Sequence, residues 1–216
     1  VILATGSTSL ELPFLPFDGK VIGSSEALSL AEVPKQLVVI GGGYIGLELG
    51  SAFAKLGSDV AVVEAQDSLL PLYDAKLTDP VTRWLQRKGV ALHLGSRALG
   101  LADDGLEIES SAGERIVLPA DKILVTVGRR PATASWGLEA MALAMDGAFV
   151  RVDDRCATST TNVWAIGDLV GEPMLAHKAS AQGEMVAEII AGKRRRFDPA
   201  AIAAVCFTEP EIVSVG

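Results

Sequence analysis

Residues 37–46 read Leu-Val-Val-Ile-Gly-Gly-Gly-Tyr-Ile-Gly. The four apolar residues at the front form the continuous run expected of a strand buried on both faces of a parallel sheet. Behind the glycines, apolar side chains recur at the spacing of a helix, at Ile45, Leu49, Phe53 and Leu56. Gly57 ends this helix, and residues 60–63 form a second strand with Glu64 at its end. The stretch therefore predicts a β-α-β unit.

The sequence around this unit continues the α/β pattern. A second helix is expected over 75–88, either starting at Pro80 with Thr78 or Asp79 as its cap or kinked at Pro80. Turn residues separate three short strands that suggest an antiparallel meander, near 97–102, 105–110 and 114–118. Further strands are expected at 1–4, 90–94, 123–127, 149–152, 163–166 and within 202–216, with helices from Ser24 to near Pro34 and over 176–191. The predicted fold class is α/β, a Rossmann-like parallel sheet with an antiparallel meander.

Length and composition exclude several classes of protein. The 216 residues correspond to one or two domains, and the net charge of −8 argues against a general nucleic-acid binder. The dense basic run at 193–196 follows an apparent helix and Gly192, so we interpret it as a helix end favoured by cations. We expect no membrane span and no signal peptide. The chain starts without Met and closes on an apparently unfinished strand, so we expect a piece of a longer polypeptide.

Two Cys and two His are too few for a disulfide scaffold or a metal cluster. Cys156 and Cys206 lie too far apart in sequence for a redox pair, and we interpret both as structural thiols. No metal site is predicted.

The glycines at 41, 43 and 46 form the G-x-G-x-x-G pattern, after a strand and at the start of a helix. Gly41 permits a tight turn, Gly43 lets a pyrophosphate approach the backbone, and Gly46 lets helix and strand pack closely. The amides and the positive end of the helix can then receive phosphate charge. Glu64, 18 residues after Gly46, supplies the carboxylate that accepts ribose hydroxyls. A dinucleotide site is predicted, and NAD rather than NADP, because Glu64 would repel a 2′-phosphate and residues 65–68 hold no cation.

Two other strand ends carry polar residues whose roles the residues alone leave open. Gly128-Arg129-Arg130-Pro131 follows an apolar strand, either at a ligand-binding edge or as a surface turn with two solvated arginines. Asp168 follows Gly167 at the end of another strand, where it could bind a sugar or ribitol hydroxyl or merely cap a turn.

Four motifs in order resemble the middle of a pyridine nucleotide–disulfide oxidoreductase, a flavoprotein with two dinucleotide-binding domains. They are Ala4-Thr5-Gly6-Ser7, the run from Gly41 to Glu48, Thr126 to Pro131, and Ala165-Ile166-Gly167-Asp168 continuing into Met174 to Ala179. Within the family they are most similar to the lipoamide dehydrogenase branch. The resemblance implies the end of a first FAD segment at 1–29, an NAD domain at 30–148, a returning FAD segment at 149–193 and the start of a dimer-interface domain at 194–216.

The resemblance also assigns roles to residues. NAD would be held by Gly41, Gly43, Tyr44, Ile45, Gly46, Glu48, Glu64 and Gly128, with Tyr44 either shielding the flavin or simply covering the cleft. FAD would be held by Thr5, Gly6, Asp168, Leu175, Ala176 and His177. Glu48 matches the acid that pairs with a Lys beside the flavin, and is the one catalytic candidate. His177 is not expected to act as an acid or base, and His93 is expected in a strand.

The implied reaction passes electrons from dihydrolipoamide to a disulfide, then to FAD and finally to NAD as hydride. The redox Cys pair and the His–Glu pair of the family would lie outside this chain, so the chain alone should bind NAD without turning over lipoamide. The resemblance further implies a cytoplasmic homodimer whose partner is dihydrolipoamide on the acyltransferase of a 2-oxo acid dehydrogenase complex.

Three alternatives stay open. Another reductase of the same superfamily (an NADH oxidase, or a mercuric or ferredoxin-type reductase) would lack the redox Cys pair or the His–Glu pair. A non-enzymatic NAD-binding module would bind NAD without flavin. A protein whose Gly-rich turns hold no nucleotide would show no NAD binding and no effect of Glu64→Ala.

Overall fold

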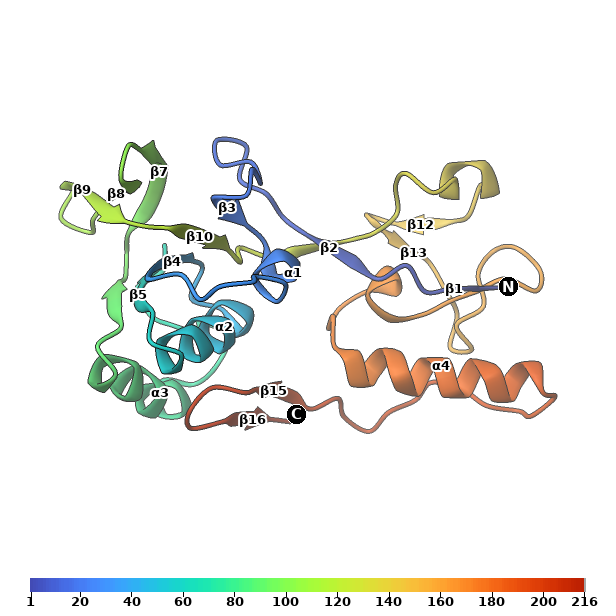
Figure 1. The fold of residues 1–216 in the computed structure, drawn as a ribbon. Helices are drawn as coiled ribbons and strands as arrows, with labels where there is room; N and C mark the ends of the chain where they lie inside the picture. The colour runs from blue at the N-terminus through green and yellow to red at the C-terminus, as the bar shows by residue number, and fades with distance from the viewer. Residues whose placement is uncertain (216) are drawn as a thin grey trace. The chain divides into compact units, whose positions relative to one another are not determined.

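A computed structural model describes residues 1–215, which form two compact units (Figure 1). Unit 1 holds residues 1–8, 129–204 and 215, and unit 2 holds residues 9–128 and 205–214. The α/β fold class with a parallel sheet and an antiparallel meander is confirmed. The motifs placed boundaries at 30 and 148, whereas the segment 129–148 packs with unit 1, where its residues Leu138 and Leu143 are buried in an apolar cluster.

Unit 2 is built on a five-stranded parallel sheet in the order β3-β10-β4-β5-β6. The strands are β3 (Val21–Ile22), β10 (Lys122–Val125), β4 (Gln36–Ile40), β5 (Asp59–Val63) and β6 (Ala91–His93). From the central β4 the chain first adds β5 and β6 on one side and later β10 on the other. The carboxyl ends of β4 and β10 therefore meet where the strand order reverses, and open α/β sheets bind ligands at such a point.

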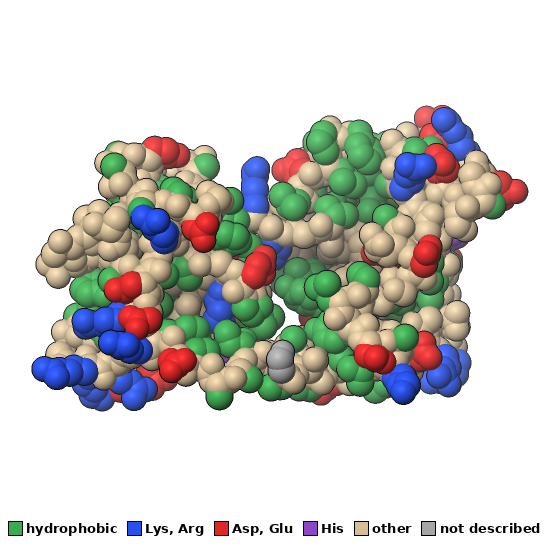
Figure 2. Space-filling model, turned by 180° about the vertical axis from the view of Figure 1, so that it is seen from behind, with side chains coloured by type: hydrophobic (Ala, Val, Ile, Leu, Met, Phe, Trp, Pro, Cys, Tyr) green, Lys and Arg blue, Asp and Glu red, His purple; other side chains and the backbone are tan. Residues whose placement is uncertain are grey.

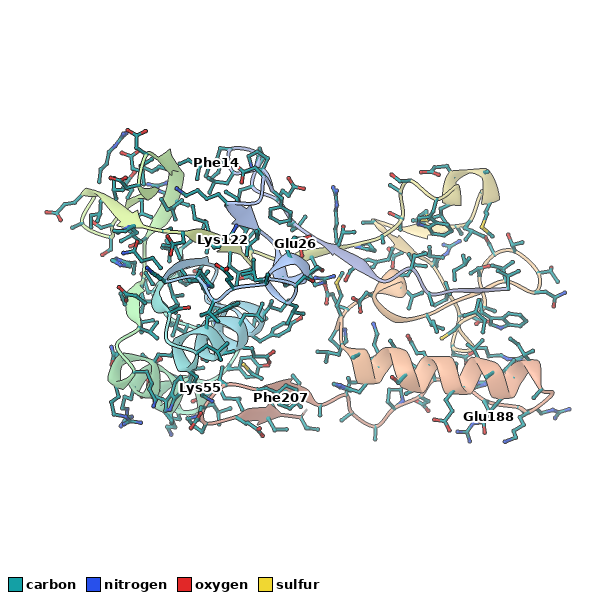
Figure 3. The ribbon with its side chains drawn as sticks, viewed as in Figure 1. Phe14, Glu26, Lys55, Lys122, Glu188 and Phe207 are labelled. Carbon is teal, nitrogen blue, oxygen red and sulfur yellow. The ribbon has the colours of Figure 1, made fainter. Side chains whose placement is uncertain are left out.

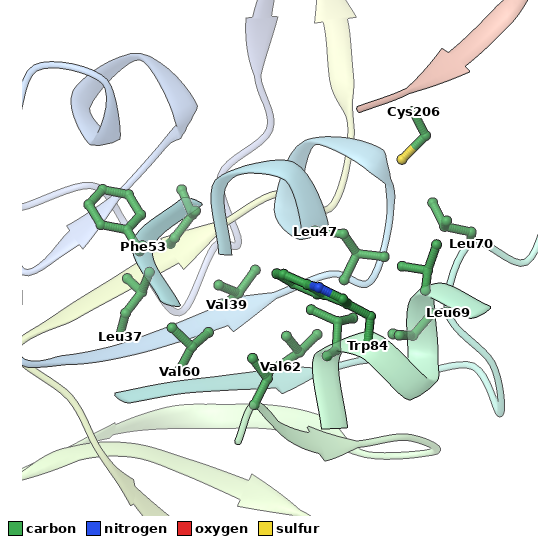
Figure 4. Packing of buried hydrophobic residues seen from close by; sticks show 14 of the residues in the cluster. Leu37, Val39, Leu47, Phe53, Val60, Val62, Leu69, Leu70, Trp84 and Cys206 are labelled. Atoms are coloured by element: carbon green, nitrogen blue, oxygen red, sulfur yellow. The ribbon is translucent and has the colours of Figure 1, made fainter. Parts of the chain in front are cut away.

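The alternation of side chains along β4 explains why its residues 37–40 are all apolar. Leu37 and Val39 pack in a cluster with α2 (Tyr44–Lys55) and α3 (Ala75–Arg87), as Figure 4 shows. Val38 and Ile40 belong to a second cluster, which includes residues of the meander on the opposite face. Both faces of the strand are covered over residues 37–40, and the one polar residue, Gln36, lies at the partly exposed start of the strand.

The meander consists of β7 (Arg97–Ala102), β8 (Gly105–Glu109) and β9 (Arg115–Pro119), all antiparallel. Its three strands confirm the predicted segments to within a residue. A register shift lies between Ala98 and Gly100. Leu106, Ile108 and Leu118 point their buried side chains into the cluster beneath the sheet.

In unit 2, α3 confirms the helix expected over 75–88 but not the start expected at Pro80, and α1 (Ser24–Ala27) is shorter than expected. α3 does not start at Pro80: its cap is Asp74, whose Oδ1 accepts the N–H of Lys76 at 2.8 Å, and Pro80 lies inside the helix. The expectation that Thr78 or Asp79 caps it is wrong, because Asp74 already satisfies the first turn. α1 is a single turn and ends well before Pro34.

Unit 1 combines short strand pairs with one long helix, α4 (Ala176–Ile190). β1 (Ile2–Leu3) pairs in parallel with β14 (Trp164–Ala165), and β12 (Met145–Asp146) pairs with β13 (Phe149–Val150). β2 (Ser7–Ser9) pairs with β11 (Arg129–Pro131). The remaining pair, β15 (Ala204–Cys206) with β16 (Ile212–Ser214), lies in unit 2 except for Ala204. Two 3₁₀ turns complete the order, η1 (Leu138–Met141) and η2 (Gly167–Val170). Within residues 1–215, no helix combines the length and apolar character needed to cross a membrane.

Candidate functional site

The turn after β4 is so tight that two of its glycines cannot be replaced. Gly41 has φ +105°, and a Cβ there would lie 2.6 Å from the carbonyl oxygen of Thr126. A Cβ on Gly46 would lie 2.3 Å from the carbonyl oxygen of Gly41 and 2.5 Å from Oγ1 of Thr126. The helix can therefore start this close to the strands only with glycine at both positions.

Thr126, directly after β10, closes this turn from the neighbouring strand. Its hydroxyl donates to the carbonyl oxygen of Ile40 at 3.0 Å and lies 3.3 Å from that of Gly41. Its N–H also donates to Ile40. The sequence assigned no role to Thr126, because its contacts span about eighty-five positions; only its place in a motif next to Gly128 could have drawn attention to it.

The open side of the turn is at Gly43, where an added Cβ would meet no atom within 4 Å. Gly43 is the N-cap of α2, and its carbonyl accepts the N–H of Leu47 as the first bond of the helix. The N–H groups of the first turn, which includes Ile45 and Gly46, therefore lie ahead of the helical ladder. Backbone N–H groups, the positive helix end and free space together form a cradle for a pyrophosphate.

Glu64 is held against this turn by two backbone N–H groups. Its Oε2 accepts the N–H of Gly42 at 2.6 Å, and its Oε1 accepts the N–H of Gln66 at 2.7 Å. Its own backbone is anchored by His93 and Ser96, at 2.9 Å each. Each carboxylate oxygen keeps a further lone pair, so the group can accept both hydroxyls of a ribose. The residues present thus fit NAD, and the half-buried carboxylate would repel a 2′-phosphate.

Glu48, on the second turn of α2, accepts the N–H of Phe207 at 2.8 Å. Phe207 follows β15, and Figure 3 labels it at the β15–β16 hairpin. Burial, together with the nearby Cys206 and Glu48, raises the pKa of Tyr73. No pattern in the sequence linked Glu48 to residues this far along the chain.

Gly128 lies two residues after Thr126 and has φ +137°. Its carbonyl oxygen accepts the N–H of Leu10 at 3.1 Å.

In unit 1, Asp168 sits in a network of side chains rather than backbone groups. The hydroxyl of Ser7 donates to Oδ2 of Asp168 at 2.5 Å. Arg129 donates from Nε to the Ser7 hydroxyl and from its terminal nitrogen to the Ser7 carbonyl, both at 2.7 Å. The half-buried Arg129 is therefore not a solvated turn residue, whereas Arg130 is exposed. Sequence reasoning missed the role of Ser7 and Arg129, since they pair across more than a hundred positions.

The remaining residues expected at FAD lie just before β2 and at the start of α4, on either side of η2 in the sequence. Gly167 has φ +75° and donates its N–H to Gln182 at 2.8 Å, which fixes the start of η2. Leu175 is the N-cap of α4, and Ala176 and His177 begin the helix with exposed side chains. Thr5 donates its hydroxyl to the carbonyl of Ala132 at 2.9 Å, and Gly6 accepts the N–H of Ala132 at 2.8 Å.

Lys178, in the first turn of α4, is a buried amine that the sequence did not single out. Its side chain is 4% exposed, and it donates to the carbonyl oxygen of Gly171. Burial lowers its pKa, while the carboxylates of Asp168 and Glu172 act in the opposite direction. A carboxylate held by the Ser7 hydroxyl is a fixed acceptor, as the ribitol hydroxyls of FAD require, so the residues present fit that cofactor.

Both cysteines are free and buried. Burial is the largest cause of the raised pKa of each thiol, which reaches about 11 for Cys156. His93 lies at the end of β6 as predicted, and burial lowers its pKa. Among residues 1–215 no group of three His, Cys, Asp or Glu side chains is arranged to hold a metal ion.

A profile of the family described as pyridine nucleotide-disulphide oxidoreductase matches residues 1–183. The chain belongs to this family. The resemblance drawn from the four sequence motifs is thereby confirmed.

Relatives within the family sharpen this placement. The chain is 60% identical over 216 residues to a dihydrolipoyl dehydrogenase of Pseudomonas aeruginosa and 44% identical over 220 residues to one of Bacillus subtilis. Each match covers 100% of this chain and 47% of the relative, so the chain spans about half the length of the curated relatives it matches.

Solved structures of family members have the same fold. The flavoprotein disulfide reductase RclA of Escherichia coli, solved as a Cu(II) complex, matches with a TM-score of 0.88 and 28% identity, over 100% of this chain and 51% of that one. LpdA of Mycobacterium tuberculosis matches with a TM-score of 0.85 and 30% identity, over 100% of this chain and 48% of that one.

Proposed function

We propose that this chain is the NAD-binding half, with part of the FAD-binding wall, of a dihydrolipoyl dehydrogenase. The whole enzyme would pass electrons from dihydrolipoamide through a disulfide and FAD to NAD. The observation that carries the proposal is the carboxylate of Glu64, held by the N–H groups of Gly42 and Gln66 beside the open glycine turn. Identity of 60% to a dihydrolipoyl dehydrogenase over the whole chain supports the same enzyme.

NAD would lie along the carboxyl edge of the sheet in unit 2. The glycine turn would receive the pyrophosphate, with the N–H groups of Tyr44, Ile45 and Gly46 directed at it. Glu64 would accept the adenosine ribose hydroxyls. Glu48, near the start of α2, would point back toward the nicotinamide end of the cofactor, and Gly128 would line the same edge.

FAD would lie against unit 1, where Asp168 would accept hydroxyls of the ribitol. Thr5 and Gly6 would line the cofactor, together with Leu175, Ala176 and His177 at the start of α4. When bound, FAD and NAD supply the redox chemistry, and the protein binds and orients them. We assign NAD binding to the 30–148 region and FAD binding to 1–29 and 149–193, with 194–216 starting the dimer-interface domain.

For the whole protein we propose a cytoplasmic homodimer that oxidises dihydrolipoamide carried by the acyltransferase of a 2-oxo acid dehydrogenase complex. The dihydrolipoyl dehydrogenase names of the relatives support the lipoamide substrate. Neither Cys156 nor Cys206 belongs to the redox pair. Both are buried, and burial raises the pKa of each thiol, which disfavours the reactive thiolate form.

The test compares the full-length protein with residues 1–216 alone. The full-length protein should form NADH from dihydrolipoamide and NAD, whereas the shorter chain should bind NADH by calorimetry and form none. The full-length Cys156→Ser and Cys206→Ser variants should keep their turnover. Production of NADH by the shorter chain, or loss of turnover in either cysteine variant, would contradict the assignment of the thiols. NADH oxidation by the full-length protein without any response to lipoamide would favour another reductase of the superfamily.

A further inference from the structure

Four arginine residues line one open hollow in unit 1, and none of them is among the residues assigned to NAD or FAD. The hollow has a volume of about 340 Å³ and is lined by Arg155, Arg194, Arg195 and Arg196. On the face shown in Figure 2, Lys and Arg side chains gather at the lower left. Such a concentration is unexpected in a chain whose net charge is −8.

Backbone contacts hold the two segments that supply these arginines. α4 ends in a Schellman turn: Gly192, with φ +91°, donates to the carbonyl of Ile189, and Lys193 donates to that of Glu188, both at 2.9 Å. Figure 3 shows Glu188 at this end of α4. Further along, the N–H of Phe197 donates to the carbonyl of Asp154 at 2.7 Å. The basic segment is thus fixed beside the 153–156 turn without help from its charges.

The apolar side of Phe197 adds to this anchor. It packs on a cluster of buried residues that joins α4 to the same turn, Cys156, Met185, Val186 and Ile189. This packing and the backbone hydrogen bonds therefore fix the backbone positions of the four arginines that line the hollow.

Acidic neighbours neutralise only part of the charge. Glu188 pairs with Lys193 at 2.7 Å and with Arg195 at 2.8 Å, and Asp154 pairs with Arg196 at 3.2 Å. Within residues 1–215, Arg155 and Arg194 have no carboxylate within 4 Å.

The other nearby carboxylates do not change this result. Asp153 uses Oδ1 to accept the backbone N–H groups of Arg155 and Ala157, and the exposed Asp198 forms no ion pair in the described part of the chain. The negative end of α4 explains a cation at Lys193 but not Arg155, which comes from a separate segment.

We propose that this hollow binds the phosphate chain of a small di- or triphosphate. A guanidinium offers two parallel N–H donors that match a phosphate, and several of them can share its oxygens. The bound anion would also balance the charge of Arg155 and Arg194, which no carboxylate of residues 1–215 neutralises. The volume falls at the lower end of the range of small-molecule sites, roughly 300–1,000 Å³. Among residues 1–215 the hollow is lined by arginines alone, so the phosphates rather than a base are recognised.

The test uses the full-length flavin-loaded protein and inorganic tripolyphosphate, titrated by calorimetry with NADH at saturation so that the dinucleotide site is filled. The variant is the double substitution Arg155→Ala and Arg194→Ala. Its matched control is the double substitution Arg97→Ala and Arg115→Ala on the meander, which removes the same charge from exposed side chains. Melting temperature and NADH affinity, measured for both, report whether the variants are folded.

Tripolyphosphate should bind the parent protein, bind the Arg155/Arg194 variant at least roughly tenfold more weakly, and bind the meander control unchanged. Replacement of the same two arginines by Lys should give an intermediate affinity, because the charge remains while the paired donors are lost. The proposal is overturned by absence of binding, by equal losses in variant and control, or by a Glu-rich peptide that binds through Arg155 and Arg194 more tightly than tripolyphosphate.

Discussion

The glycine turn of unit 2 and the Asp168 loop of unit 1 place a carboxylate after a parallel strand by different means. At the glycine turn, backbone N–H groups of Gly42 and Gln66 hold Glu64, and the turn itself is shaped by missing side chains. At the loop, the hydroxyl of Ser7 holds Asp168 and is itself held by Arg129. One site is built from backbone, the other from side chains.

The difference determines which substitutions each region tolerates. A backbone-built site fails when a side chain is added, because there is no space for one. A site built from side chains fails when a donor is removed, because the buried or half-buried acceptor is left without a partner. The predictions below test this contrast.

The largest effect is expected from Gly46→Ala. The new Cβ would lie 2.3 Å from the carbonyl oxygen of Gly41, so strand and helix must separate. Overlap with backbone should lower the free energy of unfolding by roughly 3 kcal/mol and weaken NADH binding more than about a hundredfold. Chemical denaturation and calorimetry measure the two quantities.

Gly50→Ala, in the same helix, is the matched control. A Cβ there would meet nothing nearer than 3.4 Å, at Val39. Its effect on stability should stay within about 1 kcal/mol, with a gain possible from the helix propensity of Ala. Equal damage from both substitutions would mean that the turn is not the tight element inferred here.

An intermediate effect is expected from Ser7→Ala in unit 1. Without the hydroxyl, Asp168 loses the 2.5 Å bond and Arg129 loses one acceptor. Loss of a bond to a charged group corresponds to about 1.5–3 kcal/mol, so flavin should bind the full-length apoprotein at least roughly tenfold more weakly. Quenching of flavin fluorescence measures this affinity. Thr8→Ala, on the same strand with its side chain exposed, should leave it unchanged; a matching loss there would refute the network.

The smallest effect concerns the buried thiol of unit 1 and its dependence on pH. Burial raises the pKa of Cys156 to about 11, above the 9.0 of an unperturbed thiol. Between these values the unfolded chain releases a proton that the folded chain keeps, so stability should fall as pH rises from 9 to 11 and be unaffected by this group below 9. The loss should reach about 1–2 kcal/mol. Cys156→Ser should flatten the curve in that window, and an unchanged slope would assign it to other groups.

The sequence predicted the backbone-built region well. Apolar runs at β4 and β5, the helical spacing of α2 and the position of Glu64 are local, and each follows from the period of its element. The glycines mark a turn whose geometry nothing else satisfies. The meander was equally readable, because its turns carry Gly beside Asp or Ala.

The side-chain network was not readable, because its members are distant in sequence. Ser7 and Arg129 are ordinary residues until β2 and β11 pair, and Lys178 is one lysine among several until α4 is placed. Asp74 was overlooked as a cap because Pro80 is the stronger local signal, although the helix accommodates it. The roles of these residues depend on tertiary packing, which the periodicity of a sequence does not reveal.

The most direct test of the account is the ratio of NADH to NADPH affinity in the parent protein and in Glu64→Ala, measured by calorimetry. Asp67→Ala, an exposed carboxylate three residues further on, serves as the control. The account predicts that the parent and control bind NADH at least roughly a hundredfold more tightly than NADPH, and that Glu64→Ala brings the ratio near one through loss of ribose bonding and of repulsion. A ratio that Glu64→Ala leaves unchanged would contradict the claim that Glu64 reads the ribose of NAD.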